Sequence, residues 1–171
     1  FGQLVALHTL DLGLNRLTAL PESFGQLVAL QTLELGRNEL TTLPGSFGQL
    51  VALRTLNLTG TELGALPKSF GQKPLVALQT LDLTGNKLTT GGNELTTLPD
   101  SFHQLVALET LHLTGNGLRT LPESFGKLVA IQTLNLTANK LTTLPDLRCQ
   151  RVSVSWWPFR PWTSSSPTNS N

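Results

Sequence analysis

The sequence lacks several residue types, and each absence narrows the range of possible functions. Cysteine occurs once, at Cys149, which excludes an intrachain disulfide framework and a zinc site built on cysteine pairs. Charged residues make up only 13% of the 171 residues, against about 25% in ordinary soluble domains. The twelve basic and eleven acidic side chains nearly cancel. This balance predicts no nucleic acid partner.

Long apolar runs and methionine are also missing. No segment approaches the roughly 18 apolar residues of a membrane-spanning helix, and no charged segment followed by an apolar stretch opens the chain. We therefore expect no membrane span and a cytoplasmic location. Methionine is absent even from position 1, which predicts a fragment or a processed product. The domain that defines the biological role would then lie outside this sequence.

Most of the chain is a repeat that is marked by Leu-Pro pairs. The prolines are spaced by 23 residues (44−21) except in one interval of 32 residues (99−67), and they are Pro21, Pro44, Pro67, Pro99, Pro122 and Pro145. Each unit reads Ser-Phe-Gly-Gln-Leu and then Leu-x-x-Leu-x-Leu-x-x-Asn-x-Leu, as in residues 30–40. This period lies within the roughly 20–29 residues that are typical of leucine-rich repeats.

The repeat resembles the leucine-rich repeat family over about residues 1–147. It is most similar to the LP-x-x-F-x-x-L-x-x-L-x-x-L-x-L-x-x-N-x-L-T-x subclass of Ras-suppressor-like and Roco-type GTPase proteins. The resemblance implies an α/β solenoid, a right-handed arc with a parallel concave sheet and short convex helices. The sequence holds no G-x-x-x-x-G-K-[ST] phosphate loop, so any GTPase module lies outside this chain.

Residue alternation predicts the sheet independently of the resemblance. In residues 32–35 the leucines fall on one face and the polar residues on the other, which is typical of a short half-buried strand. The return segment carries a helical signal, with Ser23 at the N-cap and Gln26 at the capping-box position. Stacked coils should bury one column of leucines: Leu33, Leu56, Leu81, Leu111 and Leu134.

Asparagine recurs at one equivalent place after the strands. The resemblance implies an internal asparagine ladder, in which each carboxamide satisfies backbone groups that the turn leaves unpaired. The predicted members are Asn15, Asn38, Asn86, Asn116 and Asn139. Thr61 interrupts the column and offers only a hydroxyl, so we expect a looser turn there.

The polar side of the strands is the predicted recognition surface, because the resemblance implies that the concave sheet binds proteins. Its middle row is Asp11, Glu34, Asn57, Asp82, His112 and Asn135, and a flanking row includes Thr32, Thr55, Thr80 and Thr110. The first two carboxylates should be neighbours, since adjacent strands stand about 4.8 Å apart. An open sheet without an enclosing pocket argues against catalysis, so we predict no catalytic, cofactor or metal site.

Three segments depart from the regular repeat. Lys73-Pro74 and an echo at residues 91–97 predict irregularity over 72–97, with only one of Asn86 and Asn93 inside the ladder. Residues 148–171 form a tryptophan-containing tail, which we expect either to cover the end of the solenoid or to be unselected sequence, with a disordered end. The first coil has none before it, which predicts possible self-association through uncapped ends.

Together these observations predict a non-enzymatic scaffold that binds a protein or peptide ligand on its concave face. Two alternatives stay open. The chain could be a regulatory leucine-rich-repeat fragment of a larger signalling GTPase or kinase, or an extracellular receptor-type recognition domain. The repeat itself names no partner.

Overall fold

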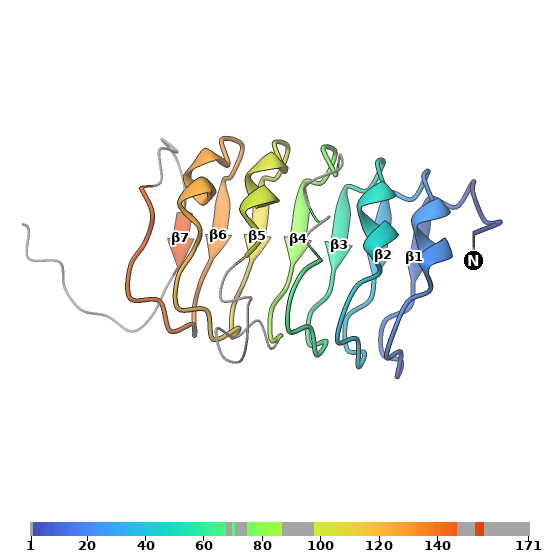
Figure 1. Cartoon of the computed structure of the whole chain (residues 1–171), viewed down its shortest axis with the longest axis horizontal. Coiled ribbons are helices and arrows are strands. Elements are labelled where there is room, and N and C mark those ends of the chain that lie inside the picture. The colour runs from blue at the N-terminus through green and yellow to red at the C-terminus, as the bar shows by residue number, and fades with distance from the viewer. Residues whose placement is uncertain (1, 68–69, 71–74, 87–97, 147–152, 156–171) are drawn as a thin grey trace, which may run out of the picture.

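The computed structural model describes residues 2–67, 70, 75–86, 98–146 and 153–155, the last three by their backbone alone. Within these ranges, seven parallel strands form one sheet in the order of the chain (Figure 1). The strands are β1 (Thr9–Asp11), β2 (Thr32–Glu34), β3 (Thr55–Asn57), β4 (Thr80–Asp82), β5 (Thr110–His112), β6 (Thr133–Asn135) and β7 (Ser153–Ser155). Each coil therefore adds one strand, and the predicted solenoid is confirmed.

The strand register joins equivalent positions of neighbouring coils. Leu10 pairs with Leu33, and Leu33 pairs with Leu56. The register also holds between β4 and β5, where Leu81 pairs with Leu111 although the repeat is longer there. The extra residues therefore do not shift the sheet.

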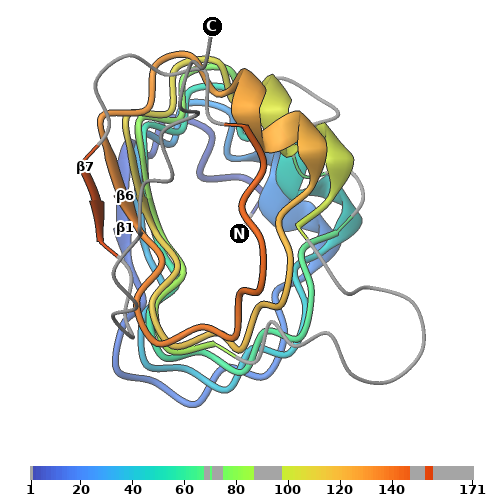
Figure 2. The ribbon, with the colours of Figure 1, turned by 90° about the vertical axis from the view of Figure 1, so that its left-hand side faces the viewer.

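The core lies inside the coils, between the strands and the return segments. Figure 2 views the solenoid along its length and shows the strands on one side of each coil and the short helices on the other. The predicted column of leucines is confirmed, because all five side chains have no exposed surface. Five phenylalanine rings stack beside it with centroids 6.0–6.3 Å apart: Phe24, Phe47, Phe70, Phe102 and Phe125.

The described helices of the return segments are 3-10 helices of five residues. They are η1 (Glu22–Gln26), η2 (Gly45–Gln49), η3 (Asp100–Gln104) and η4 (Glu123–Lys127). Each starts directly after a proline, whose fixed φ suits a helix start and whose missing N–H is not needed there.

The predicted capping role of Ser23 is wrong. Pro21 is the N-cap of η1, and no side chain caps that helix. Serines of this column bond to the preceding coil instead: the Ser46 hydroxyl donates to the Glu22 carbonyl at 2.6 Å, and the Ser124 hydroxyl donates to the Asp100 carbonyl at 3.0 Å. A five-residue 3-10 turn closes its own backbone bonds at i+3, so these hydroxyls are left to link neighbouring coils.

The two irregular segments are described only in part. Asn86 lies in the ladder, whereas residues 87–97 and 71–74 lie outside the described residues, and with them Asn93, Lys73 and Pro74. The sheet extends beyond the expected repeat boundary at residue 147, because Ser153–Ser155 pairs in parallel with β6. The three tail tryptophans, Trp156, Trp157 and Trp162, are outside the described residues.

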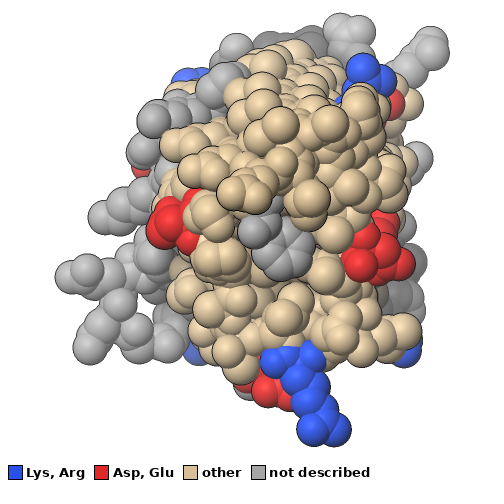
Figure 3. Space-filling model, turned by 90° about the vertical axis from the view of Figure 1, so that its right-hand side faces the viewer, with Lys and Arg blue, Asp and Glu red and all other residues tan. Residues whose placement is uncertain are grey.

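The N-terminal end of the solenoid exposes apolar surface. Leu4 and Val5 are 51% and 54% exposed, and Leu10 and Leu12 are only partly buried against the core. In Figure 3 the described surface of this end is largely free of charged side chains across its middle, with acidic and basic groups at its margins.

Candidate functional site

The sheet register places the predicted recognition row side by side. Asp11 pairs with Glu34, and Glu34 pairs with Asn57. Farther along, Asp82 pairs with His112, and His112 pairs with Asn135. Every member of the row keeps exposed surface. The threonines at the start of each strand pair in the same way, for example Thr32 with Thr55 and Thr80 with Thr110.

Four members of this row are committed to their own turns. Each accepts a hydrogen bond through Oδ1 from the backbone N–H two residues later, at 2.8–3.0 Å. They are Asp11, Asn57, Asp82 and Asn135. Short Asp and Asn side chains reach this donor, which is the geometry of an Asx turn. These Asx turns were not predicted from the sequence. Asp or Asn recurs at the last position of these strands, two residues before the N–H that is bound, and this recurrence could have predicted them.

Glu34 and His112 differ from the other members of the row. Within the described part of the chain, neither side chain makes a hydrogen bond. Their side chains are longer than those of Asp and Asn, and both stand partly exposed on the sheet. Their polar groups are therefore available to a ligand without any cost to a turn.

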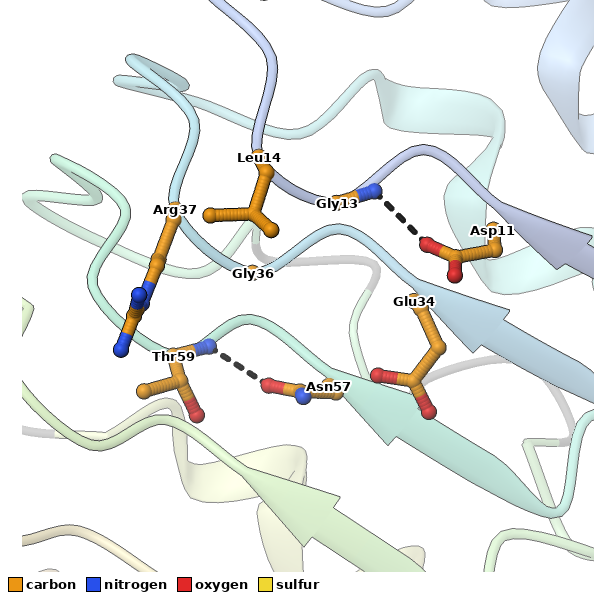
Figure 4. Close-up of a pocket in the computed structure, with 8 residues that line it drawn as sticks. All are labelled: Asp11, Gly13, Leu14, Glu34, Gly36, Arg37, Asn57 and Thr59. Atoms are coloured by element: carbon orange, nitrogen blue, oxygen red, sulfur yellow. Dashed lines mark hydrogen bonds between the residues drawn. The ribbon is translucent and has the colours of Figure 1, made fainter.

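A groove of about 430 Å³ lies where β1, β2 and β3 end (Figure 4). It is lined by Asp11, Gly13, Leu14, Glu34, Gly36, Arg37, Asn57 and Thr59. Figure 4 shows the carboxylates of Asp11 and Glu34 on one side of the groove and the Arg37 side chain on the other. Leu14 adds an apolar side chain to the lining, and 74% of its surface is exposed.

Two residues of the groove adopt a backbone conformation that other coils give to glycine. Leu14 has φ 58° and Arg37 has φ 57°, whereas the equivalent glycines of the next coils, Gly60, Gly85 and Gly115, have φ 61°, 68° and 70°. The left-handed region costs a residue with a side chain roughly 1–2 kcal/mol. The equivalent Ala138 has φ 56° outside the groove, so this conformation belongs to the turn of the repeat and not to the groove alone.

The asparagine ladder runs behind the row and holds neighbouring coils together. The Asn38 amide donates to the carbonyls of Leu12 (2.9 Å) and Leu35 (2.8 Å), and its Oδ1 accepts from the N–H of Leu17 (2.9 Å). Asn86 and Asn139 likewise donate to carbonyls of their own coil and of the coil before. These bonds fix the turns that carry the groove.

The N-terminal end and the middle of the ladder deviate from this pattern. Asn15 is exposed, and its amide donates only within its own turn, to the carbonyls of Leu12 and Gly13. Thr61 is buried, and its hydroxyl bonds to the Leu58 carbonyl at 3.2 Å and to Oδ1 of Asn86. Oδ1 of Asn116 has no partner among the described residues, and the N–H that would continue the pattern, that of Leu88, lies outside them.

Two kinds of feature are absent from the part of the chain that the structure describes. Its residues contain no group of three or more His, Cys, Asp or Glu side chains placed to hold a metal ion. No helix among them has the length and apolar character that crossing a membrane requires.

Comparison with known families matches most of the chain to leucine-rich repeats. The description "Leucine rich repeat" fits residues 5–63 and 77–105, and "Leucine Rich repeats (2 copies)" fits residues 106–149. No curated protein matches the sequence.

Solved structures share the fold. A leucine-rich repeat protein of Leptospira interrogans is 34% identical with a TM-score of 0.59, over 90% of this chain and 49% of that one. A chain in the structure of the Arabidopsis receptor kinase HAESA with the peptide hormone IDA and the co-receptor SERK1 is 31% identical with a TM-score of 0.66, over 82% and 23%. InlP of Listeria monocytogenes is 29% identical with a TM-score of 0.68, over 86% and 39%. This chain spans less than half the length of each.

Proposed function

We propose that this leucine-rich repeat solenoid is a non-enzymatic recognition module that binds a protein or peptide along its concave sheet. The observation that carries the proposal is the groove at the ends of β1–β3, which is lined by the carboxylates of Asp11 and Glu34 on one side and by Arg37 on the other. The ladder and the sheet register hold these coils in place before a ligand arrives. A preorganised surface loses little conformational entropy on binding.

The charges of the row favour a ligand that carries basic side chains. Asp11 and Glu34 are paired neighbours, and Asp82 stands two strands beyond Glu34. A lysine or arginine of the ligand would meet the Glu34 carboxylate and Oδ2 of Asp11, the oxygen that the turn does not use. A ligand carboxylate would meet Arg37 across the groove. Exposed Leu14 supplies apolar contact beside them.

The structural neighbours support a peptide or protein as the ligand. The structure that contains HAESA is a complex with a peptide hormone and a co-receptor. Leucine-rich repeats serve in general as protein recognition modules, because stacked repeats build an extended concave surface.

The experiment starts from a peptide display library panned on the immobilised chain. Peptides that are selected on the wild type are titrated calorimetrically into a triple variant, Asp11→Asn/Glu34→Gln/Asp82→Asn. These changes remove charge and keep the turn acceptors, since Asn already serves that purpose at residues 57 and 135. We expect selected peptides to be rich in Lys and Arg, and the variant to bind them about tenfold more weakly.

The matched control for this titration is Glu123→Gln, which removes a carboxylate from the convex helix η4. It should bind the peptides as the wild type does. Equal losses in the control and the triple variant, or no loss in the triple variant, would place the site elsewhere.

The likeness to a receptor kinase favours a second candidate, an extracellular receptor-type recognition domain of a longer protein. Membership of the Ras-suppressor-like or Roco-type subclass, with a regulatory role beside a GTPase or kinase, stays a proposal that rests on the 23-residue repeat. The complete coding sequence separates the two: a secretion signal supports the receptor, and a phosphate loop or kinase domain without one supports the regulatory fragment.

A further inference from the structure

One row of exposed apolar side chains has no role in the fold or in the concave site. Each turn between a return segment and its strand carries a valine, and these turns lie along the upper edge of the solenoid in Figure 1. The residues, here called the valine ridge, are 43–77% exposed: Val5, Val28, Val51, Val76, Val106 and Val129.

Burial of the core does not require these valines. The leucine just before each of Val28, Val51 and Val106 is at most 1% exposed and supplies the inward contact of its turn. The valines point outward on successive coils spaced by about 4.8 Å, so the ridge is an apolar stripe about 24 Å long. Contiguous exposed apolar surface of this kind marks interaction sites.

Two charged residues beside the ridge indicate what kind of partner it binds. The residue just before each strand forms a row that flanks the valines on the sheet side, and it reads His8, Gln31, Arg54, Gln79, Glu109 and Gln132. Arg54 and Glu109 are both exposed, and they lie one coil on either side of Gln79. Within the described residues neither takes part in a side-chain hydrogen bond or ion pair.

This arrangement is complementary to a second copy of itself. Two copies can place their ridges face to face with the coils running in opposite order. If the two-fold axis passes through the coil that carries Val76 and Gln79, then Arg54 of each copy faces Glu109 of the other. The same operation places Val51 opposite Val106 and Val28 opposite Val129. With coils in the same order, neither charge would meet an opposite charge in this row. Isologous contacts of this kind close after two copies.

We propose that the valine ridge is the interface of a two-fold symmetric dimer of this chain, in which Arg54 and Glu109 pair twice across the axis. A standard interface buries about 800 Å² per partner, so the flanking glutamines must join the valines in the contact. An apolar centre with uncharged polar margins and few charges is the usual composition of such an interface. The dimer leaves both concave sheets open to ligand.

The test uses the full chain and sedimentation equilibrium over a range of concentrations. We expect the wild type to follow a monomer–dimer equilibrium, and Val51→Gln/Val106→Gln to dimerise about tenfold more weakly. Circular dichroism should show the same fold, and at concentrations low enough for both proteins to be monomeric the melting temperatures should be close, because about half of each valine side chain is exposed. The control is Leu144→Gln, a leucine that is 37% exposed and belongs neither to the ridge nor to the groove, which should dimerise as the wild type does.

Charge reversal tests the orientation. Arg54→Glu alone and Glu109→Arg alone should each weaken the dimer, since like charges then meet across the axis. The double variant Arg54→Glu/Glu109→Arg should return to within about threefold of the wild type. A wild-type chain that stays monomeric at its solubility limit overturns the proposal, as does a double variant no stronger than the singles. Growth beyond two copies overturns it too and indicates end-to-end stacking through the uncapped N-terminal coil.

Discussion

The carboxylate of Glu22 accepts hydrogen bonds from the backbone N–H groups of Gly45 (3.1 Å) and Ser46 (3.0 Å), which begin the 3-10 helix of the next coil. The Ser46 hydroxyl donates back to the Glu22 carbonyl. The N–H of Ser46, followed by its hydroxyl and the N–H of Gly45, holds the pKa of Glu22 below its ordinary value. One carboxylate thus joins two coils on the convex side.

This contact should make stability depend on pH. Because the pKa of Glu22 is lower in the folded chain, its bonds stabilise the fold above the unfolded-state pKa, and this contribution is lost as pH falls through the folded value. Glu22→Gln should therefore melt below the wild type at neutral pH, and the difference should shrink in acid. Thermal unfolding followed by circular dichroism at several pH values measures it, with Glu123→Gln at the matching position of η4 as control. A constant difference at all pH values would contradict the assignment.

The asparagine ladder predicts unequal effects of the same substitution. Asn38→Ala would remove the side-chain partner of the Leu17 N–H and of the Leu35 carbonyl, and one of the two side-chain donors to the Leu12 carbonyl, so it should cost about 1–3 kcal/mol of unfolding free energy. Asn15→Ala removes an exposed side chain and should change stability by less than about 0.5 kcal/mol. Urea denaturation compares the two variants. Equal losses would show that the buried bonds contribute nothing beyond the turn itself.

The leucine column predicts where truncation is costly. Leu111 has no exposed surface, so Leu111→Ala should lower the unfolding free energy by roughly 2–5 kcal/mol through lost burial and the cavity that remains. Val129→Ala shortens a side chain that is 77% exposed, and it should change stability by about 0.5 kcal/mol or less. Both values come from denaturant titrations of the full chain. A small loss at Leu111 would mean that the core relaxes around the truncation.

Arg37 should trade stability for binding. It holds a left-handed backbone that glycine adopts freely, so Arg37→Gly should raise the unfolding free energy by up to about 1 kcal/mol. The same change removes the only cation of the groove lining and should weaken ligands that present a carboxylate there. Denaturation and calorimetry on one preparation measure both effects. The control is Ala138→Gly, which relieves similar left-handed strain (φ 56°) outside the groove and should leave binding unchanged. Loss of stability in Arg37→Gly would show that its side chain packs more favourably than the strain costs.

The predictable part of the structure is the part that repeats. Leu33, Leu56 and Leu81 could be placed in one buried column because stacked coils give equivalent residues equivalent neighbours. Asn38 could be placed in a ladder for the same reason. The spacing of adjacent parallel strands also predicted that Asp11 would lie beside Glu34, which holds the equivalent place in the next repeat, as the register shows.

The features that could not be predicted from the sequence are hydrogen bonds and strand pairings that depend on atoms of two coils or on backbone angles. Ser23 matches a helix cap in sequence, but the length of a five-residue 3-10 turn decides that serines of this column bond to the coil before. Asp82 and Asn135 match a ligand-binding row, but their Oδ1 atoms reach the turn N–H. The pairing of β7 with β6 has no counterpart in the leucine pattern, because any extended backbone can satisfy the edge of a sheet.

The amino-acid pattern alone sets the period, the core and the polar face, since a 23-residue unit with leucines at these places can bury them only by stacking. Tertiary structure decides which polar residues remain available to a ligand. Asp11 and Asn57 accept hydrogen bonds from their own turns, whereas Glu34 does not. Arg37, which has a left-handed backbone just after β2, lines the same groove. These distinctions arise from distances of about 3 Å between particular atoms, which residue spacing along the chain does not specify.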